Sequence, residues 1–219
     1  MVIGASQRFR DRTEAGSLLG ERLRRLGVPH DPVVLALPRG GVPVAAEVAL
    51  ALGAPLDVLV VRKLGAPGHE ELAIGAIAPG VRVLNEALIR ELGLSPAELA
   101  TIEARARAEL ERRERLYGRA QPPPQIEGRT AILVDDGLAT GSTMLAALSS
   151  VRAARPAAVL VAVPVADLEI CRMLGAEVEV VCLLTPHPLG AVGAYYEDFS
   201  QTGDAEVRAL LGAARERAS

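Results

Sequence analysis

Ala131-Ile132-Leu133-Val134-Asp135-Asp136-Gly137-Leu138-Ala139-Thr140-Gly141-Ser142-Thr143 is the stretch of sequence that decides the fold. Four apolar residues predict a short buried strand, two carboxylates follow it, and a loop of small residues then opens a helix over 141–153. A strand that passes through such a loop into a helix is typical of parallel α/β sheets. In these sheets the ligand binds at the carboxyl ends of the strands.

The sequence on either side of this motif repeats the same alternation of strand and helix. Strands are predicted over 33–37, 56–61, 131–134, 157–165 and 178–184, and helices over 13–26, 43–52, 141–153, 167–174 and 204–217. Alternation of this kind favours a doubly wound, mainly parallel sheet flanked by helices. We therefore expect a single α/β domain over residues 1–219.

The segment between the second strand and the motif has a different pattern. Pro79-Gly80 separates two β-prone runs, 72–77 and 81–84, and predicts a hairpin. Residues 85–117 predict a helical insertion broken at 93–95, where Ser95, Pro96 and Glu98 form a capping box. Glu and Arg recur at spacings of three and four in 103–115, which favours a solvated, ion-paired helix over an RNA-binding face. Residues 121–125 contain three prolines and predict a stiff linker.

Composition limits the classes of protein that are compatible with this chain. It has 219 residues, half of them hydrophobic, and a formal net charge of -3. No apolar run approaches the roughly 20 residues that span a bilayer, so we expect no membrane partner and a cytoplasmic location. The acidic balance argues against DNA binding. Cys171 and Cys182 lack zinc-ligand spacing and are expected to be reduced, buried thiols.

The two halves of the motif favour different ligand groups. Residues 139–143 offer backbone N–H groups and three hydroxyls at a helix N-terminus, which is favourable for a phosphate dianion. Asp135 and Asp136 would repel a phosphate but accept hydrogen bonds from neutral hydroxyls. A ligand that satisfies both halves has a sugar diol close to a phosphate, as ribose 5-phosphate does.

The motif resembles the phosphoribosyl pyrophosphate (PRPP) motif of type I phosphoribosyltransferases. The resemblance implies that Asp135 and Asp136 hold the ribose hydroxyls, and that the 5′-phosphate is held by Ala139, Thr140, Gly141, Ser142 and Thr143. It also implies Mg²⁺, held mainly by substrate oxygens with no protein ligand assigned to the metal. Gly137 departs from the family pattern, where many members have a bulkier apolar residue, and predicts a looser spacer.

Two further strand ends carry groups suited to pyrophosphate. Arg39 supplies a bidentate fork, and Gly40 and Gly41 permit close approach of backbone N–H groups to anionic oxygens. Arg62 and Lys63 follow the next strand, and Lys63 is the only lysine beside 23 arginines. In related enzymes a basic residue at this position contacts pyrophosphate. Lys63 and Asp136 are our candidate catalytic residues, although chance placement of Lys63 remains an alternative.

Other family elements map onto less specific segments. Residues 64–77 would occupy the position of the flexible loop that closes over the site, and contain His69, which either assists a leaving group or is a solvated loop residue. The hood that binds the base would come from residues 1–27 and 185–203. In the second segment Tyr195, Tyr196 and Phe199 either stack on a planar acceptor or form a local packing cluster.

The expected reaction is transfer of ribose 5-phosphate from PRPP to a base or amine, with release of pyrophosphate. A second hypothesis is a regulatory protein that senses PRPP and binds RNA, because fold alone does not fix function. A synthetase that makes PRPP is disfavoured by the chain length and by the lack of an ATP-binding loop pattern. Related enzymes are commonly dimers, so a homodimer is expected, with 85–117 as a candidate interface.

Overall fold

The computed structural model describes residues 8–28, 31–117 and 125–218. The first seven residues of the expected hood, and the expected linker apart from Gln125, lie outside these ranges. No helix in the described ranges is long and apolar enough to cross a membrane.

A five-stranded parallel sheet forms the centre of the molecule, in the order β2-β1-β6-β7-β8. Its strands are β1 (Pro32–Ala36), β2 (Leu56–Val58), β6 (Thr130–Val134), β7 (Ala158–Val165) and β8 (Glu179–Leu184). The chain proceeds outward from β1 in one direction and from β6 in the other, so the strand order reverses between them. This confirms the expected mainly parallel, doubly wound sheet and puts its switch point at the β1–β6 pair.

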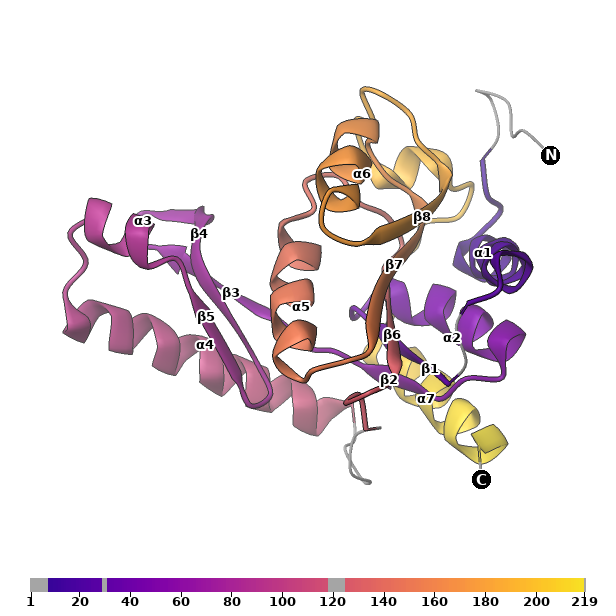
Figure 1. The fold of residues 1–219 in the computed structure, drawn as a ribbon, viewed down its shortest axis with the longest axis horizontal. Coiled ribbons are helices and arrows are strands. Elements are labelled where there is room, and N and C mark those ends of the chain that lie inside the picture. Colours follow the sequence, from indigo (N-terminus) through magenta and orange to yellow (C-terminus); the bar gives the residue numbers. More distant parts are fainter. Residues whose placement is uncertain (1–7, 29–30, 118–124, 219) are drawn as a thin grey trace.

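Helices cover both faces of this sheet, as Figure 1 shows. One core packs beneath α1 (Arg12–Leu26), α2 (Gly41–Leu52) and α7 (Asp204–Ala218), and the other beneath α5 (Ser142–Ala153) and α6 (Leu168–Gly175). Successive strand residues alternate between the two cores. Ile132 and Val134 of β6 face the first, and Ala131 and Leu133 face the second. Burial on both faces explains why these strands read as continuous apolar runs.

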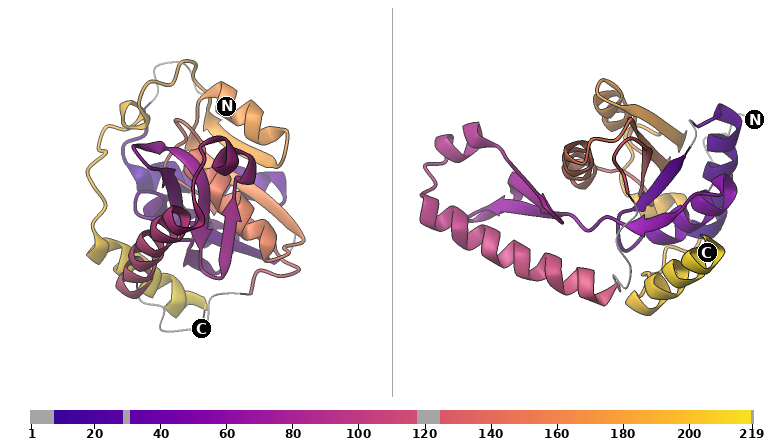
Figure 2. Two further views of the ribbon diagram at one scale, coloured as in Figure 1. Left: turned by 90° about the vertical axis from the view of Figure 1, so that its left-hand side faces the viewer. Right: turned by 60° about the horizontal axis from the view of Figure 1, so that its bottom comes forward.

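An arm projects from the sheet and is built by residues 62–116 (Figures 1 and 2). It contains an antiparallel sheet of β3 (Arg62–Ala66), β4 (His69–Ala78) and β5 (Val81–Leu84), together with α3 (Glu86–Glu91) and α4 (Pro96–Leu116). The predicted hairpin and the Ser95–Glu98 capping box are both present. The ion pairs of Glu109 with Arg112 and Arg113 fit a solvated helix.

Two expectations for this region are wrong. The strand predicted over 56–61 ends at Val58, and the chain then leaves the parallel sheet to begin β3. Residues 64–77, expected to be a flexible loop, instead form most of β3 and β4, which pair with each other in antiparallel register. Pro67 and Gly68 turn the chain between them, so the Gly and Pro content marks a tight turn within a hairpin.

The N-terminal end of the described chain meets the segment that follows β8. Phe9 pairs with Tyr196 as an isolated parallel bridge, and backbone hydrogen bonds join Phe9 to Tyr195 and to Glu197. The short 3₁₀ helix η1 (Val192–Tyr195) lies within this second segment. Parts of both hood candidates therefore form one layer.

Candidate functional site

Two loops meet at the switch point between β1 and β6. The loop after β1 contains the Pro38–Arg39 peptide, which is cis, followed by Gly40 and Gly41. A Cβ added at Gly40 would lie 2.0 Å from Asp136 Oδ2, and one at Gly41 would lie 2.8 Å from the Val134 carbonyl oxygen. Both positions therefore require glycine for close approach of the two loops. The expected pyrophosphate loop and acidic pair are in direct contact.

The expected phosphate loop forms the entrance to α5. Gly141 precedes the helix with φ +69°, a left-handed conformation that favours glycine. Ala139, Thr140 and Thr143 are exposed, and Ser142 is half-buried. The α6 residue Ile170 packs closely against the Gly141 backbone. The loop thus presents exposed donors at a helix N-terminus, supported from below by α6.

Lys63 reaches this loop from the arm. Its Nζ donates to Ser142 Oγ at 3.3 Å, although the two residues are 79 positions apart. Arg62 precedes it in β3, so its side chain projects from the opposite face of the strand. The Arg62 Nε is buried and has no hydrogen-bond partner among the described residues. Of the two expected cations, the structure brings Lys63 to the phosphate loop.

The two carboxylates have different environments. Burial raises the pKa of Asp135 well above its usual range, and the neighbouring charge of Asp136 raises it further. Asp135 Oδ1 accepts the Asp136 backbone N–H at 2.9 Å. Asp136 instead forms an ion pair with Arg12 from α1, at 2.8 Å between Nη2 and Oδ2. Sequence reasoning missed Arg12, because nothing in its local pattern distinguishes it from the other arginines.

Gly137 is more tightly packed than its sequence suggested. A Cβ added there would lie 2.5 Å from Val192 Cγ1 and 3.0 Å from Val165 Cγ1. The missing side chain therefore makes room for Val192, which belongs to the segment after β8. The expectation of a looser spacer is wrong, because the space is filled from another part of the chain.

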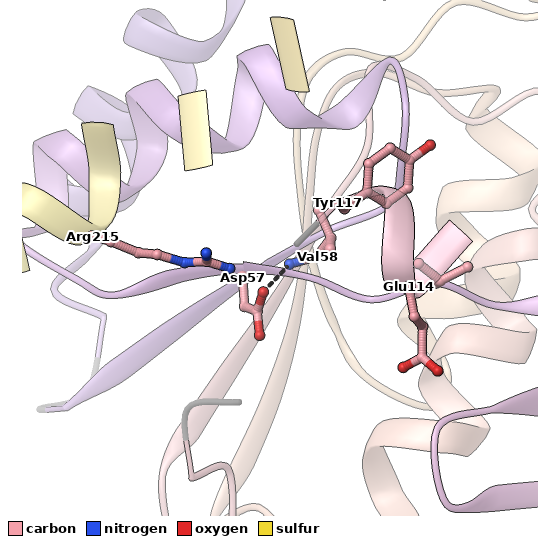
Figure 3. A pocket seen from close by; sticks show the side chains of 6 residues that line it. Asp57, Val58, Glu114, Tyr117 and Arg215 are labelled. Atoms are coloured by element: carbon pink, nitrogen blue, oxygen red, sulfur yellow. Dashed lines mark hydrogen bonds between the residues drawn. The ribbon is translucent and has the colours of Figure 1, made fainter. Parts of the chain in front are cut away.

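Arg39 points toward the end of the arm. Its Nη1 lies 3.9 Å from Asp204 Oδ1, which also accepts a 3.3 Å hydrogen bond from the Tyr117 hydroxyl. Burial, followed by the charge of Asp204, raises the pKa of Tyr117. Tyr117 also borders a small pocket, lined by Asp57, Val58, Val60, Glu114, Tyr117 and Arg215. Figure 3 shows Arg215 from α7 extending toward Asp57 of β2.

The aromatic residues expected in the acceptor pocket form a cluster. Tyr196 is buried, with its ring centroid 5.4 Å from that of Phe9 and 5.0 Å from that of Phe199. Its hydroxyl donates to the Asp136 carbonyl oxygen at 2.6 Å. Phe199 remains 37% exposed and Tyr195 is half-buried. The contacts of Tyr196 match the packing alternative, which leaves Tyr195 and Phe199 as the more accessible rings.

The two histidines in the described ranges, and both cysteines, lie outside these loops. His69 is exposed at the β3–β4 turn. His187 Nδ1 lies 3.2 Å from Asp167, the N-cap of α6, and Glu169 completes a mostly exposed group at the carboxyl ends of β7 and β8. Cys171 and Cys182 are free, half-buried thiols whose sulfur atoms lie 2.8 Å apart.

The site has oxygen ligands that suit Mg²⁺ bound together with a polyphosphate. Magnesium prefers oxygen ligands and is usually held by one or two carboxylates plus substrate phosphates. Asp135 and Asp136 supply carboxylate oxygens directly beside the loop expected to hold pyrophosphate. The residues therefore fit a metal that enters with its substrate.

This arrangement agrees with the family to which the sequence can be matched. Residues 14–182 match the family model described as the phosphoribosyl transferase domain. The chain belongs to this phosphoribosyl transferase family. Proteins from two strains of Mycobacterium tuberculosis, named provisionally as phosphoribosyl transferases, are 49% identical over 205 residues, 93% of this chain. The match covers 46% of those proteins, so the chain spans about half of their length.

Two solved structures resemble this fold. A Thermus thermophilus protein has 49% sequence identity and a TM-score of 0.86, with 94% of this chain and 98% of that chain covered. A Neisseria gonorrhoeae protein crystallised with bound ppGpp has 14% sequence identity and a TM-score of 0.50, with 96% of this chain and 99% of that chain covered. At that identity the second likeness shows the fold alone.

Proposed function

We propose that this chain uses PRPP and Mg²⁺ to transfer ribose 5-phosphate to a nitrogenous acceptor, most simply a nucleobase, with release of pyrophosphate. One observation carries this proposal. The acidic pair, the partly exposed loop 139–143 and the glycine loop at residues 40 and 41 converge at the switch point of the sheet. Family membership supports a transferase, while the donor and the acceptor are our inference from the site.

The proposed division of labour follows from charge. Asp135 and Asp136 accept hydrogen bonds from the ribose hydroxyls, and the uncapped N-terminus of α5 holds the 5′-phosphate. Arg39 and the backbone around Gly40 and Gly41 hold pyrophosphate. Lys63, which contacts the phosphate loop, stabilises negative charge on the departing pyrophosphate. Bound Mg²⁺ would neutralise further charge on the same oxygens.

We propose that the hood binds the nitrogenous acceptor. Phe199, whose ring lies against the Arg12 guanidinium, is 37% exposed, and Tyr195 is half-buried, so both offer accessible ring surface. A planar base stacked on either ring would gain on the order of 1 to 3 kcal/mol. We propose Asp136 as the general base for the acceptor, because it is acidic and lies close to the expected sugar site.

A pyrophosphate-release assay with PRPP and Mg²⁺, run across a panel of bases and amines, tests this function. We expect turnover with at least one acceptor. Asp135→Asn and Asp136→Asn should weaken PRPP binding, whereas Lys63→Arg should keep binding and slow turnover. Glu127→Gln is a matched control, because Glu127 is an exposed carboxylate paired with Arg155. No turnover, together with no stabilisation of the wild-type protein by PRPP, would exclude the proposal.

The alternative of a PRPP sensor that binds RNA is less well supported. Its basis was the arginine-rich part of α4, where Arg112, Arg113 and Arg115 each pair with a glutamate of the same helix. Those pairs reduce the positive charge available to a phosphate backbone. RNA retention that falls with rising salt concentration would favour this alternative.

A further inference from the structure

Arg12 joins the acidic pair to the segment after β8. All three nitrogens of its guanidinium group take part. Nε donates to Asp136 Oδ2 at 2.9 Å, and Nη2 lies 2.8 Å from the same oxygen. Nη1 donates to the Ser200 carbonyl oxygen at 2.7 Å. The guanidinium carbon also lies 3.9 Å from the centre of the Phe199 ring. This one side chain therefore connects α1, the loop after β6 and the segment after β8.

The ion pair is enclosed. The side chains of Arg12 and Asp136 are only 11% and 16% exposed. The Gly40 backbone covers Asp136 Oδ2, since a Cβ there would fall 2.0 Å from this oxygen. Both Arg12 bonds end on Oδ2, so Oδ1 lies outside the ion pair. The Asp136 carboxylate therefore has a fixed orientation. Its Oδ2 is bound by Arg12, and its Oδ1 takes no part in the ion pair.

A gain in folding stability is not a sufficient reason for an enclosed ion pair. Removing two charges from water is costly, and replacing a buried ion pair by apolar residues is often neutral or stabilising. The need to orient the Asp136 carboxylate is a sufficient reason. A carboxylate that must accept hydrogen bonds from a sugar binds more tightly if its rotamer is fixed before the ligand arrives.

Resting on the proposed function, we infer that Arg12 is a positioning residue that holds the Asp136 carboxylate in the orientation that accepts the ribose hydroxyls of PRPP. Phe199 supports Arg12 by stacking on its guanidinium. The assignment gives the aromatic segment a role on the donor side of the reaction. It also distinguishes two ligand groups. Arg12 should matter more for binding of the sugar than for binding of pyrophosphate, because Mg²⁺ is expected to be held mainly by the oxygens of the substrate itself.

The test compares the binding of two ligands, PRPP and inorganic pyrophosphate, each with Mg²⁺, by calorimetry. Arg12→Gln should weaken PRPP binding by about ten- to a hundredfold, the usual effect of removing a group that orients a ligating side chain. Its pyrophosphate affinity should stay within about twofold of the wild type. Arg12→Lys keeps the charge without the fork and should recover part of the loss. Arg10→Gln is the control, because the Arg10 side chain is 69% exposed and pairs with the adjacent Asp11.

Phe199→Leu provides a milder variant should Arg12→Gln fail to fold. It leaves both partners of the ion pair and removes the ring beneath the guanidinium, so PRPP binding should weaken by about two- to fivefold. Unchanged PRPP affinity in the Arg12 variants, or equal losses for PRPP and pyrophosphate, would overturn the positioning role. If the wild type itself binds no PRPP, the proposed function fails instead. The two failures are therefore distinguishable.

Discussion

At the scale of single residues, Asp135 shows that the site is built at a cost in stability. Its carboxyl is buried beside a second carboxylate, and both effects raise its pKa. The folded protein therefore binds this proton more tightly than the unfolded chain does. Protonated Asp135 therefore contributes to the free energy of unfolding. This contribution is complete below the pKa that Asp135 has in the unfolded chain, and it is lost as the pH rises through its higher pKa in the folded protein.

We therefore predict that Asp135→Asn stabilises the protein at alkaline pH. Asparagine keeps an oxygen to accept the Asp136 N–H but carries no charge. The gain should be about 1 to 2 kcal/mol at alkaline pH and should disappear as the pH falls to the ordinary pKa of an aspartate, about 3.9. Thermal unfolding across this pH range measures it. An equal gain at every pH would show that Asp135 is not the titrating group, and the variant should still lose PRPP affinity.

Gly137 gives a second prediction at this scale. Gly137→Ala should destabilise the protein by about 1 to 3 kcal/mol, because the new methyl group overlaps Val192. Truncation of the partner in Gly137→Ala/Val192→Ala should restore part of the loss. Chemical denaturation of the two single variants and the double variant measures the coupling. Additive losses would contradict the contact.

These residues also mark the limit of sequence reasoning. The role of Asp135 and Asp136 was inferred from their order after a buried strand, and the structure puts both beside the glycine loop. Arg12 and Val192 gave no such signal, because each acts across a large sequence separation. Arg12, for example, lies 124 positions from Asp136. Such a contact is set by the packing of α1 and the hood, which local pattern does not encode.

At the scale of elements, prediction was best where local chemistry is specific. Pro79-Gly80 fixed the β4–β5 hairpin, and Ser95 with Glu98 fixed the start of α4. Residues 64–77 were misread because Gly and Pro indicate a turn without giving its length. The run 72–77 was read as β-prone, but the Gly and Pro residues before it made 64–71 resemble a loop, whereas the structure pairs β3 directly with β4 on either side of Pro67 and Gly68.

The contact between α6 and β8 predicts a disulfide under oxidising conditions. The sulfur atoms of Cys171 and Cys182 lie 2.8 Å apart, and the hydrogen bond with Cys182 lowers the pKa of Cys171. The Cys171 thiolate should attack hydrogen peroxide, forming a sulfenic acid and releasing hydroxide. The Cys182 thiol should then attack the Cys171 sulfur, forming the disulfide and releasing the sulfenic oxygen as water.

Closure of this short loop should raise the unfolding free energy by about 3 kcal/mol. Mass spectrometry under non-reducing conditions and thermal unfolding with and without reductant measure it. Cys171→Ser is the control, which should gain no stability from peroxide treatment. Intermolecular crosslinking in place of the internal bond would contradict this geometry.

At the scale of the whole molecule, the hood joins the N-terminal segment and the segment after β8 to the acidic pair. Phe9 lies before α1 and is only 3% exposed, packed on Tyr196, whose hydroxyl binds the Asp136 backbone. Arg12 follows three residues later and binds the Asp136 side chain. The acidic pair is thus held by the layer that would also receive the acceptor.

This connection predicts that Phe9→Ala affects ligand binding without touching the ligand. Loss of the buried ring should cost about 3 kcal/mol of unfolding free energy. It should also weaken PRPP binding more than pyrophosphate binding, because the hood that holds Asp136 loses its anchor while the loop at Gly40 and Gly41 keeps its own contacts. Leu50→Ala is the control, since Leu50 on α2 is 54% exposed and lies outside the hood. Equal affinities for PRPP in both variants, measured by calorimetry at a temperature where each is folded, would show that the hood stabilises the fold without ordering the site.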